Sequence, residues 1–163
     1  MAKRFRGRPV GSTGTAVALH PHDIQSALRV ARRERYATRA ELLVLLSTIL
    51  GLRASELAPI KINDVYASDG TLLQVIAVGR SFLPSKRKQI DISDLHKVRA
   101  ALSDYFEKEL RDITDAQAPL FRSQQGGALR SQVIARYLTS LYRRAGIVGA
   151  SSRSGRKTFI RSM

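Results

Sequence analysis

One short stretch of the sequence combines a buried helix with a charged side chain that could bind a phosphate. Residues 42–50 are almost wholly apolar, and Arg53 stands just after them in Gly51-Leu52-Arg53-Ala54-Ser55-Glu56-Leu57. A guanidinium anchored by a rigid core is suited to two-pronged binding of a phosphate. The alternative is an arginine that caps the C-terminus of that helix and pairs with Glu56. Arg53 alone leaves both interpretations open.

The charge of the chain indicates a polyanionic partner. The 163 residues carry a formal net charge of +15, with a pI near 11.2. After Asp115 there is no acidic residue, so this basic segment cannot be neutralised from within itself. Nucleic acid is therefore the expected partner, and an anionic membrane surface is the weaker alternative. An RNA-binding or ribosome-associated protein remains a third hypothesis, because charge alone does not separate DNA from RNA.

Other function classes find no support in the sequence. The chain has no cysteine, which excludes disulfides and thiolate metal sites. His20 and His22 flank Pro21, but no third ligand stands near them, so we expect no metal site. Residues 149–158 lack the spacing of a phosphate-binding loop. There is neither an apolar run long enough to span a membrane nor a signal-peptide pattern, which predicts an intracellular protein.

The periodicities predict a mainly helical α+β fold. Residues 1–16 should form a flexible basic arm, in which Arg6-Gly7-Arg8-Pro9 resembles an AT-hook core; a plain solvated tail is the alternative. Residues 17–163 should form one domain. Thr38 and Glu41 are spaced as a capping box, and Ser93 is the expected N-cap of a later helix. The expected elements are helices after Pro21 and over 38–50, 94–111 and 131–145, a turn over 54–58, antiparallel strands over 72–78 and 88–92, and a last helix around Thr158.

Four ordered blocks resemble the catalytic domain of the tyrosine recombinases, the phage-integrase family. Residues 51–57 resemble the first arginine box of that family, and Asn63-Asp64-Val65 follows at the usual distance. Lys86 lies in the expected β-hairpin. Ala118-Pro119-Leu120-Phe121 precedes a helix that ends in Ala145-Gly146-Ile147. Ser151-Ser152-Arg153-Ser154-Gly155-Arg156-Lys157-Thr158-Phe159 resembles the second box, so the resemblance covers about residues 20–163.

The resemblance implies roles for particular residues. Arg53 and Arg156 would bind the non-bridging oxygens of the scissile phosphate of double-stranded DNA. Lys86 would act as general acid toward the leaving 5′ oxygen, with Lys88 as the alternative. Arg153 stands where the family has a histidine. No metal and no small-molecule cofactor is implied. The expected DNA contacts are Arg6, Arg8, Arg80, Lys88, Arg130 and Lys157.

The sequence departs from the family in two respects. Arginine at position 153 cannot shuttle a proton near neutral pH. The family's nucleophilic tyrosine has no counterpart after Arg156, because the last tyrosine is Tyr142. We therefore expect a chain truncated before the nucleophile, which binds DNA without cutting it and is a monomer, whereas a complete parent recombinase would be a tetramer on DNA. The expected location is cytoplasmic, with the nucleoid of a bacterium or with phage DNA. The alternative is a non-catalytic relative with a regulatory or architectural role.

Overall fold

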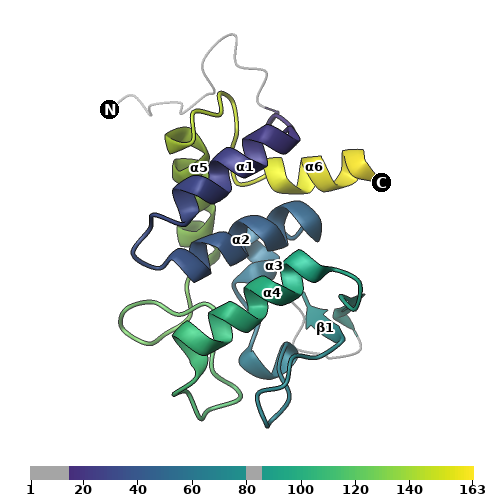
Figure 1. Cartoon of the computed structure of the whole chain (residues 1–163), viewed down its shortest axis with the longest axis vertical. Coiled ribbons are helices and arrows are strands. Elements are labelled where there is room, and N and C mark those ends of the chain that lie inside the picture. Colours follow the sequence, from purple (N-terminus) through teal and green to yellow (C-terminus); the bar gives the residue numbers. More distant parts are fainter. Residues whose placement is uncertain (1–14, 80–85) are drawn as a thin grey trace, which may run out of the picture.

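A computed structural model describes residues 15–79 and 86–163, and six α-helices and two strands lie in these ranges (Figure 1). The expectations for the N-terminal arm, with Arg6 and Arg8, and for Arg80 fall outside them. The elements are α1 (Pro21–Ala31), α2 (Ala37–Ile49), α3 (Ala54–Leu57), the 3-10 turn η1 (Ile62–Asp64), β1 (Val75–Val78), β2 (Lys88–Asp91), α4 (His96–Tyr105), the π-helical turn η3 (Phe106–Leu110), α5 (Ser131–Arg144) and α6 (Ser154–Ser162).

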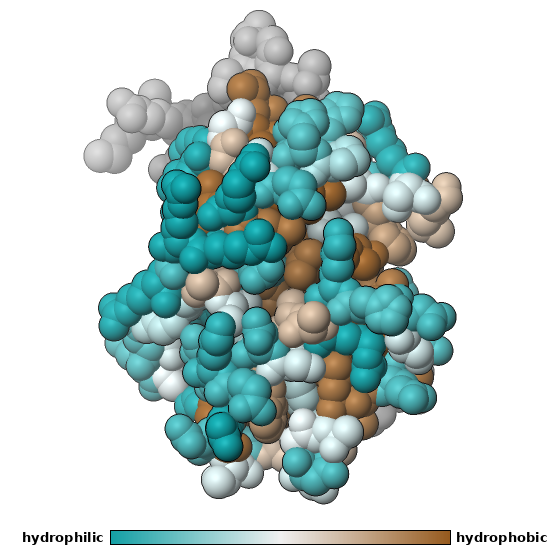
Figure 2. All heavy atoms as spheres, viewed as in Figure 1, coloured by the Kyte–Doolittle hydropathy of each residue, from teal (hydrophilic) through white to brown (hydrophobic). Residues whose placement is uncertain are grey.

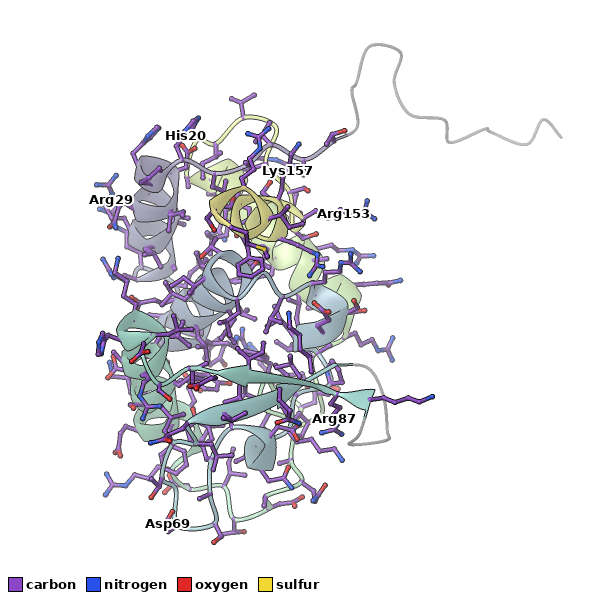
Figure 3. All side chains as sticks on the ribbon, turned by 90° about the vertical axis from the view of Figure 1, so that its right-hand side faces the viewer. His20, Arg29, Asp69, Arg87, Arg153 and Lys157 are labelled. Carbon is purple, nitrogen blue, oxygen red and sulfur yellow. The ribbon has the colours of Figure 1, made fainter. Side chains whose placement is uncertain are left out.

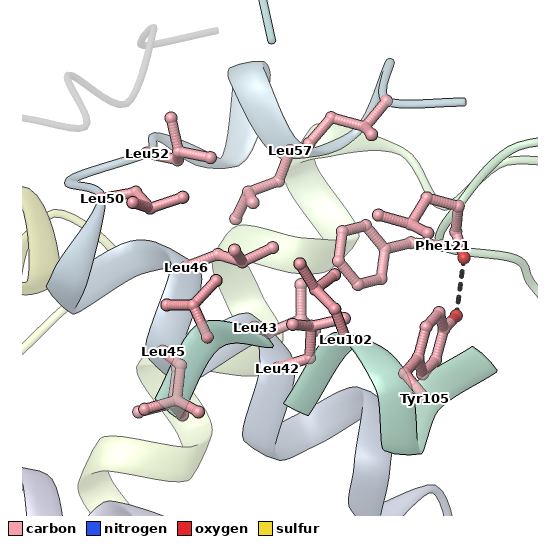
Figure 4. Packing of buried hydrophobic residues seen from close by; sticks show 14 of the residues in the cluster. Leu42, Leu43, Leu45, Leu46, Leu50, Leu52, Leu57, Leu102, Tyr105 and Phe121 are labelled. Atoms are coloured by element: carbon pink, nitrogen blue, oxygen red, sulfur yellow. Dashed lines mark hydrogen bonds between the residues drawn. The ribbon is translucent and has the colours of Figure 1, made fainter. Parts of the chain in front are cut away.

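Helix α2 is the central element of the core, as its apolar sequence predicts. Every residue from Leu42 to Thr48 is buried, and α1, α4 and α6 all pack against α2 (Figure 1). A helix that is apolar on all sides must be covered on all sides. Figure 4 shows its leucines beside Phe121 and Tyr105, whose hydroxyl donates a 2.6 Å hydrogen bond to the carbonyl of Leu120. The segment around Leu120 therefore belongs to the core.

The small sheet is an antiparallel pair, as predicted, but its first strand is shorter. The register pairs Val75 with Asp91 and Val78 with Lys88. Residues 72–74 were expected to continue β1. Instead, Leu72 forms an isolated bridge with Tyr66, and so this part of the chain turns toward the segment that follows η1. The second strand matches the expectation to within one residue.

Two helix starts differ from the sequence prediction. Thr38 is not an N-cap: α2 begins at Ala37, because the N–H of Ala40 already bonds to the carbonyl of Tyr36. Ser93 is not an N-cap either, since α4 begins at His96 after Leu95. The carboxylate of Asp91 accepts the Ser93 N–H at 2.8 Å in a local turn, which delays the helix. Thr38 is instead buried in the first turn of α2.

The helix predicted over 94–111 changes its hydrogen bonding before it ends. It is α-helical to Tyr105 and continues as the π-turn η3. The Phe106 ring packs tilted against Tyr66, with 4.9 Å between the ring centroids. The last helix, α6, begins at Ser154 and contains Thr158, as expected. None of the helices in the described part of the chain has the length and apolar character needed to cross a membrane.

Candidate nucleic-acid interface

A basic cleft of about 840 Å³ opens between α3, α5 and α6. The three elements supply its walls from distant parts of the sequence. Arg53 and Arg156, predicted to meet on one phosphate, both line this cleft, and Arg153 and Lys157 line it with them. The full lining is Arg53, Ala54, Ser55, Ser131, Gln132, Ala135, Ser152, Arg153, Arg156, Lys157, Ile160 and Arg161, which contains no carboxylate.

One hydrogen bond and one longer ion pair place the guanidinium of Arg156 beside the first arginine segment. Its Nη1 donates to the carbonyl of Gly51 at 3.1 Å and lies 4.0 Å from Oε2 of Glu56. That same carboxylate oxygen accepts the backbone N–H of Arg53 at 2.8 Å. Glu56 therefore connects the two arginine segments. A guanidinium has five donors, so these contacts leave Arg156 with further N–H groups for an anion.

The contacts of Glu56 bear on the expected pair between Arg53 and Glu56. The described contacts include no ion pair between Arg53 and Glu56, because the guanidinium close to Glu56 is that of Arg156. From Arg53, the Glu56 carboxylate accepts a hydrogen bond of the backbone N–H and not of the side chain, at the start of α3. The Arg53 side chain is exposed on the cleft wall. The Arg53 guanidinium is therefore not paired with Glu56 as the capping interpretation expects. Sequence reasoning missed that the Glu56 carboxylate lies near the guanidinium of Arg156.

Two glycines allow α6 to approach α2 closely enough to form the cleft. Gly51 ends α2 with φ at +65°, and a Cβ there would lie 2.6 Å from Cγ of Phe159 on α6. A Cβ on Gly155 would lie 2.8 Å from the carbonyl oxygen of Ser47 on α2. Neither site has room for a side chain. Because Arg156 directly follows Gly155, this contact also sets the position of its guanidinium.

Polar side chains hold the start of α6 in place. Thr139 on α5 accepts the N–H of Ser152 at 3.0 Å, and the hydroxyl of Ser154 accepts the N–H of Ser151 at 3.0 Å. Thr158 accepts the N–H of Leu19 at 2.8 Å, which ties the segment before α1 to α6. The loop that carries Arg153 is therefore bonded to α5 and within itself, and this fixes where Arg153 enters the cleft.

The hairpin lysines are not brought into the cleft lining. Lys86 and Lys88 are exposed, whereas Arg87 between them donates a 2.6 Å hydrogen bond to Asp64. The side chains of Arg87 and Asp64 are only 16% and 11% exposed, so this ion pair anchors the hairpin. Figure 3 shows Arg87 and Arg153 on the same side of the molecule. Arg130, also predicted as a contact, immediately precedes α5 and is exposed.

None of the five tyrosines of the chain lines the cleft. Burial raises the pKa of Tyr137 and of Tyr142 to about 12, and it also raises the pKa of Tyr66 and of Tyr105. A buried phenol with a raised pKa is harder to deprotonate and therefore a poor nucleophile. These tyrosines serve the core and its edge.

The described residues contain no group of three or more His, Asp or Glu side chains that could hold a metal ion. The rings of His20 and His22 stack 5.6 Å apart, and Asp23 forms a capping hydrogen bond to the N–H of His20. These side chains are accounted for by the start of α1. The guanidinium groups that line the cleft can bind an anion and stabilise its charge.

The sequence pattern of the phage integrase family matches residues 18–163. Among solved structures, XerA recombinase is similar with a TM-score of 0.70 at 24% identity, over 90% of this chain and 50% of that chain. The integrase from mycobacterium phage Brujita has a TM-score of 0.61 at 22% identity, over 94% and 45%. Lambda integrase (residues 75–356) bound to DNA has a TM-score of 0.63 at 15% identity, over 89% and 50%.

The chain therefore shares the fold of these proteins and spans about half of their length. The match includes both arginine segments and the hairpin between them. No curated protein has a sequence that matches the chain.

Proposed function

This chain belongs to the phage integrase family, and from that premise we propose that its cleft binds the phosphate backbone of double-stranded DNA. The observation that carries the proposal is that Arg53 and Arg156 line one basic cleft together. The cleft is far larger than a single phosphate, and an extended polyanion would fill it. Lys157 on the cleft wall, and Arg130, which precedes the lining residue Ser131, would contact flanking phosphates. Such contacts position a duplex without reading its sequence.

We assign the two central arginines to one scissile phosphate. Arg53 and Arg156 would donate to its non-bridging oxygens and stabilise the charge that develops when the phosphorus becomes five-coordinate. Gly51 and Glu56 already orient the guanidinium of Arg156 without DNA, and such preorganisation lowers the cost of the transition state. Arg153 would add a further donor, in place of a group that can transfer protons.

Lys86 is the proposed general acid, with Lys88 as the alternative. In the reaction the hydroxyl of a tyrosine in the complete recombinase would lose its proton to solvent and its oxygen would bond to phosphorus. The bond from phosphorus to the 5′ oxygen would break, and that oxygen would take a proton from the lysine. The exposed lysines flank the anchored Arg87 on the side of the molecule that also carries Arg153 (Figure 3). DNA in the cleft would therefore come within reach of the hairpin.

We propose cleavage and rejoining of DNA as the activity of a complete recombinase built on this domain. The 163 residues alone would bind DNA without cutting it, because none of their tyrosines lines the cleft. Their charge of +15 makes copies of the chain repel one another. We therefore propose a monomer in the absence of DNA, located with bacterial or phage DNA, and sedimentation would test the monomeric state.

The test is the affinity for a fluorescent duplex, measured at several salt concentrations. Arg53→Gln and Arg156→Gln should each weaken binding about tenfold and reduce the salt slope by roughly 0.9, because each removes one phosphate contact. Arg111→Gln is the matched control: Arg111 is 73% exposed, pairs with Glu107 and does not line the cleft. Equal losses in all three variants would mean that net charge, rather than the cleft, drives binding. Stronger competition by structured RNA than by duplex DNA would overturn the choice of partner.

A further inference from the structure

The end of α1 carries a second set of arginines, away from the cleft. Arg29, Arg33 and Arg35 are all exposed, and together we name them the α1 arginine surface. In Figure 3, Arg29 points to the opposite side of the molecule from Arg153. Figure 2, which has the same view as Figure 1, shows strongly hydrophilic side chains gathered around the place where α1 ends. The proposed function makes no use of this surface.

The acidic residues near the α1 arginine surface are already neutralised by other arginines. Glu41 pairs with Arg32 at 3.1 Å, and Glu34 pairs with Arg144 of α5. The described ion pairs include none that involves Arg29, Arg33 or Arg35. The surface therefore presents uncompensated positive charge.

Two of these side chains are held in place. Nη2 of Arg29 donates a 3.0 Å hydrogen bond to the hydroxyl of Ser26. The guanidinium of Arg35 lies over the Tyr36 ring, 5.4 Å from its centroid, and that of Arg39 lies over the same ring at 4.5 Å. Cation–π contact fixes a guanidinium plane while its edge N–H groups stay available. An oriented set of donors suits phosphate oxygens better than a flexible tail does.

We propose that the α1 arginine surface binds the backbone of a second DNA duplex, so that one chain can bridge two duplexes. The inference rests on the proposed DNA binding by the cleft. A straight duplex that contacts Arg153 in the cleft would run on the side of the molecule away from Arg29, because these two side chains point to opposite sides (Figure 3). Phosphate spacing is dense enough that arginines one helical turn apart, such as Arg29 and Arg33, can each meet a phosphate.

A capture experiment tests the bridge. A duplex fixed on beads is saturated with the protein, and retention of a second, fluorescent duplex is measured at several salt concentrations. In R29Q/R33Q/R35Q, capture of the second duplex should fall. The slope of log affinity against log salt concentration should also become smaller in magnitude by roughly 2 to 3, at about 0.9 for each lost phosphate contact. Affinity for the first duplex should change less than about threefold, because the cleft is intact.

The matched control removes the same charge elsewhere. K97Q/K108Q/R111Q loses three exposed positive charges that belong neither to the cleft lining nor to the α1 arginine surface and should retain capture. Equal loss of capture in the two triple variants would overturn the proposal, because it would make bridging a matter of net charge. Preferential capture of an RNA hairpin would overturn it as well.

Two further readouts separate this inference from simpler explanations. Arginines near the end of α1 also stabilise the helix dipole, so thermal unfolding is measured for each variant. A variant that is destabilised but captures normally would leave only that structural role. Arg53→Gln reports on the cleft: if the first duplex binds Arg53→Gln as well as wild type, the proposed function fails. Binding of a duplex to the α1 arginine surface can still be measured in that case, by immobilising the protein itself on the beads and comparing wild type with R29Q/R33Q/R35Q.

Discussion

Gly155 on α6 lies so close to Ser47 on α2 that a methyl group on Gly155 would come within 2.8 Å of the Ser47 carbonyl oxygen. This contact connects the core to the cleft, because Ser47 lies in the buried stretch 42–48 of α2 and Arg156 follows Gly155. Helix α2 thus positions both arginine segments. Arg53 follows the C-terminal end of α2, and Arg156 follows the glycine that packs against Ser47 on the side of α2. The geometry of the proposed phosphate site is therefore a property of helix packing.

Gly155→Ala should destabilise the protein and weaken DNA binding together. The added methyl group must displace α6, which costs about 1 to 3 kcal/mol, although alanine favours a helix over glycine by about 1 kcal/mol. Urea unfolding measures the free energy, and duplex binding reports the displacement of Arg156. Gly127→Ala is the control, because a Cβ on Gly127 meets nothing within 4 Å. A stable Gly155→Ala protein with normal binding would show that the packing does not set the site.

Gly51→Ala should lower the free energy of unfolding more than Gly146→Ala does. Both glycines have a positive φ, but only Gly51 also lacks space for a Cβ. Gly51 has φ at +65° and touches Phe159, whereas Gly146 has φ at +78° with nothing within 4 Å of an added Cβ. The left-handed conformation costs a residue with a Cβ about 1 to 2 kcal/mol, and overpacking against Phe159 adds about 1 to 3 kcal/mol. Gly146→Ala should show the first cost alone. Equal losses of unfolding free energy would mean that Phe159 moves aside freely.

The sequence predicts the elements that dominate the core, and the structure confirms them. The almost wholly apolar run of α2 predicts a buried helix, and the glycine that follows it is visible in the sequence. The start of α2 was not predicted correctly, because the turn after α1 extends the helix back to Ala37. Likewise, Asp91 takes the N–H of Ser93 and delays α4. Local bonds between neighbouring residues compete with capping signals of similar strength.

Periodicity carries no information about which basic residues share a site. Arg53 and Arg156 were joined by family resemblance, and the lining of the cleft shows them together. The position of Gly155 against Ser47 depends on a tertiary contact that no local pattern encodes. The contact between Glu56 and Arg156 could not be predicted for the same reason. The spacing of Glu56 from Arg53 suggests a local pair, whereas its carboxylate lies near the guanidinium of Arg156 on α6.

Asp64→Asn should destabilise the hairpin anchor. The Asp64 carboxylate accepts bonds from Arg87 at 2.6 Å and from the N–H of Lys61 at 2.9 Å. Removing its charge weakens the ion pair with the mostly buried guanidinium of Arg87, which should cost about 2 to 3 kcal/mol in urea unfolding. Glu107→Gln breaks the exposed pair with Arg111 and should cost less than about 0.5 kcal/mol. Similar losses for both variants would contradict the anchoring role.

Tyr142→Phe should leave stability unchanged or raise it at neutral pH. The hydroxyl of Tyr142 is buried and makes no hydrogen bond within the described residues, and the same holds for the Ser47 hydroxyl. Replacing an unsatisfied hydroxyl by hydrogen removes a desolvation cost of about 1 kcal/mol. A loss of more than about 1 kcal/mol in chemical unfolding would indicate a hydrogen bond that Tyr142 makes in solution.

The alkaline stability of the protein should depend on the same residue. Burial raises the pKa of Tyr142 to about 12, while an unfolded tyrosine titrates near 10. Between these values the unfolded chain has lost the proton and the folded chain has kept it, so the free energy of unfolding falls as pH rises. Below about pH 10 both states are protonated and the effect vanishes. Tyr142→Phe should make the decline between pH 10 and 12 shallower, by about 1.4 kcal/mol per pH unit at most.

A single introduced cysteine can test whether the hairpin reaches DNA in the cleft. The chain has no native cysteine, so Lys86→Cys provides a unique thiol at the position of the proposed general acid. With a duplex that carries a disulfide-activated tether on one backbone phosphate, Lys86→Cys should crosslink when the tether lies near the phosphate that Arg53 and Arg156 bind. Gel mobility under non-reducing conditions measures the yield.

Three comparisons make this result specific. Lys88→Cys distinguishes the alternative acid, since only the residue that faces the phosphate should crosslink quickly. Lys108→Cys, an exposed site in η3 that does not line the cleft, should crosslink slowly. Adding Arg156→Gln should lower the yield from Lys86→Cys by about tenfold at limiting protein, because the duplex then binds less tightly. A yield from Lys86→Cys no higher than that from Lys108→Cys would remove Lys86 from the proposed site, and the cleft arginines would then act without it.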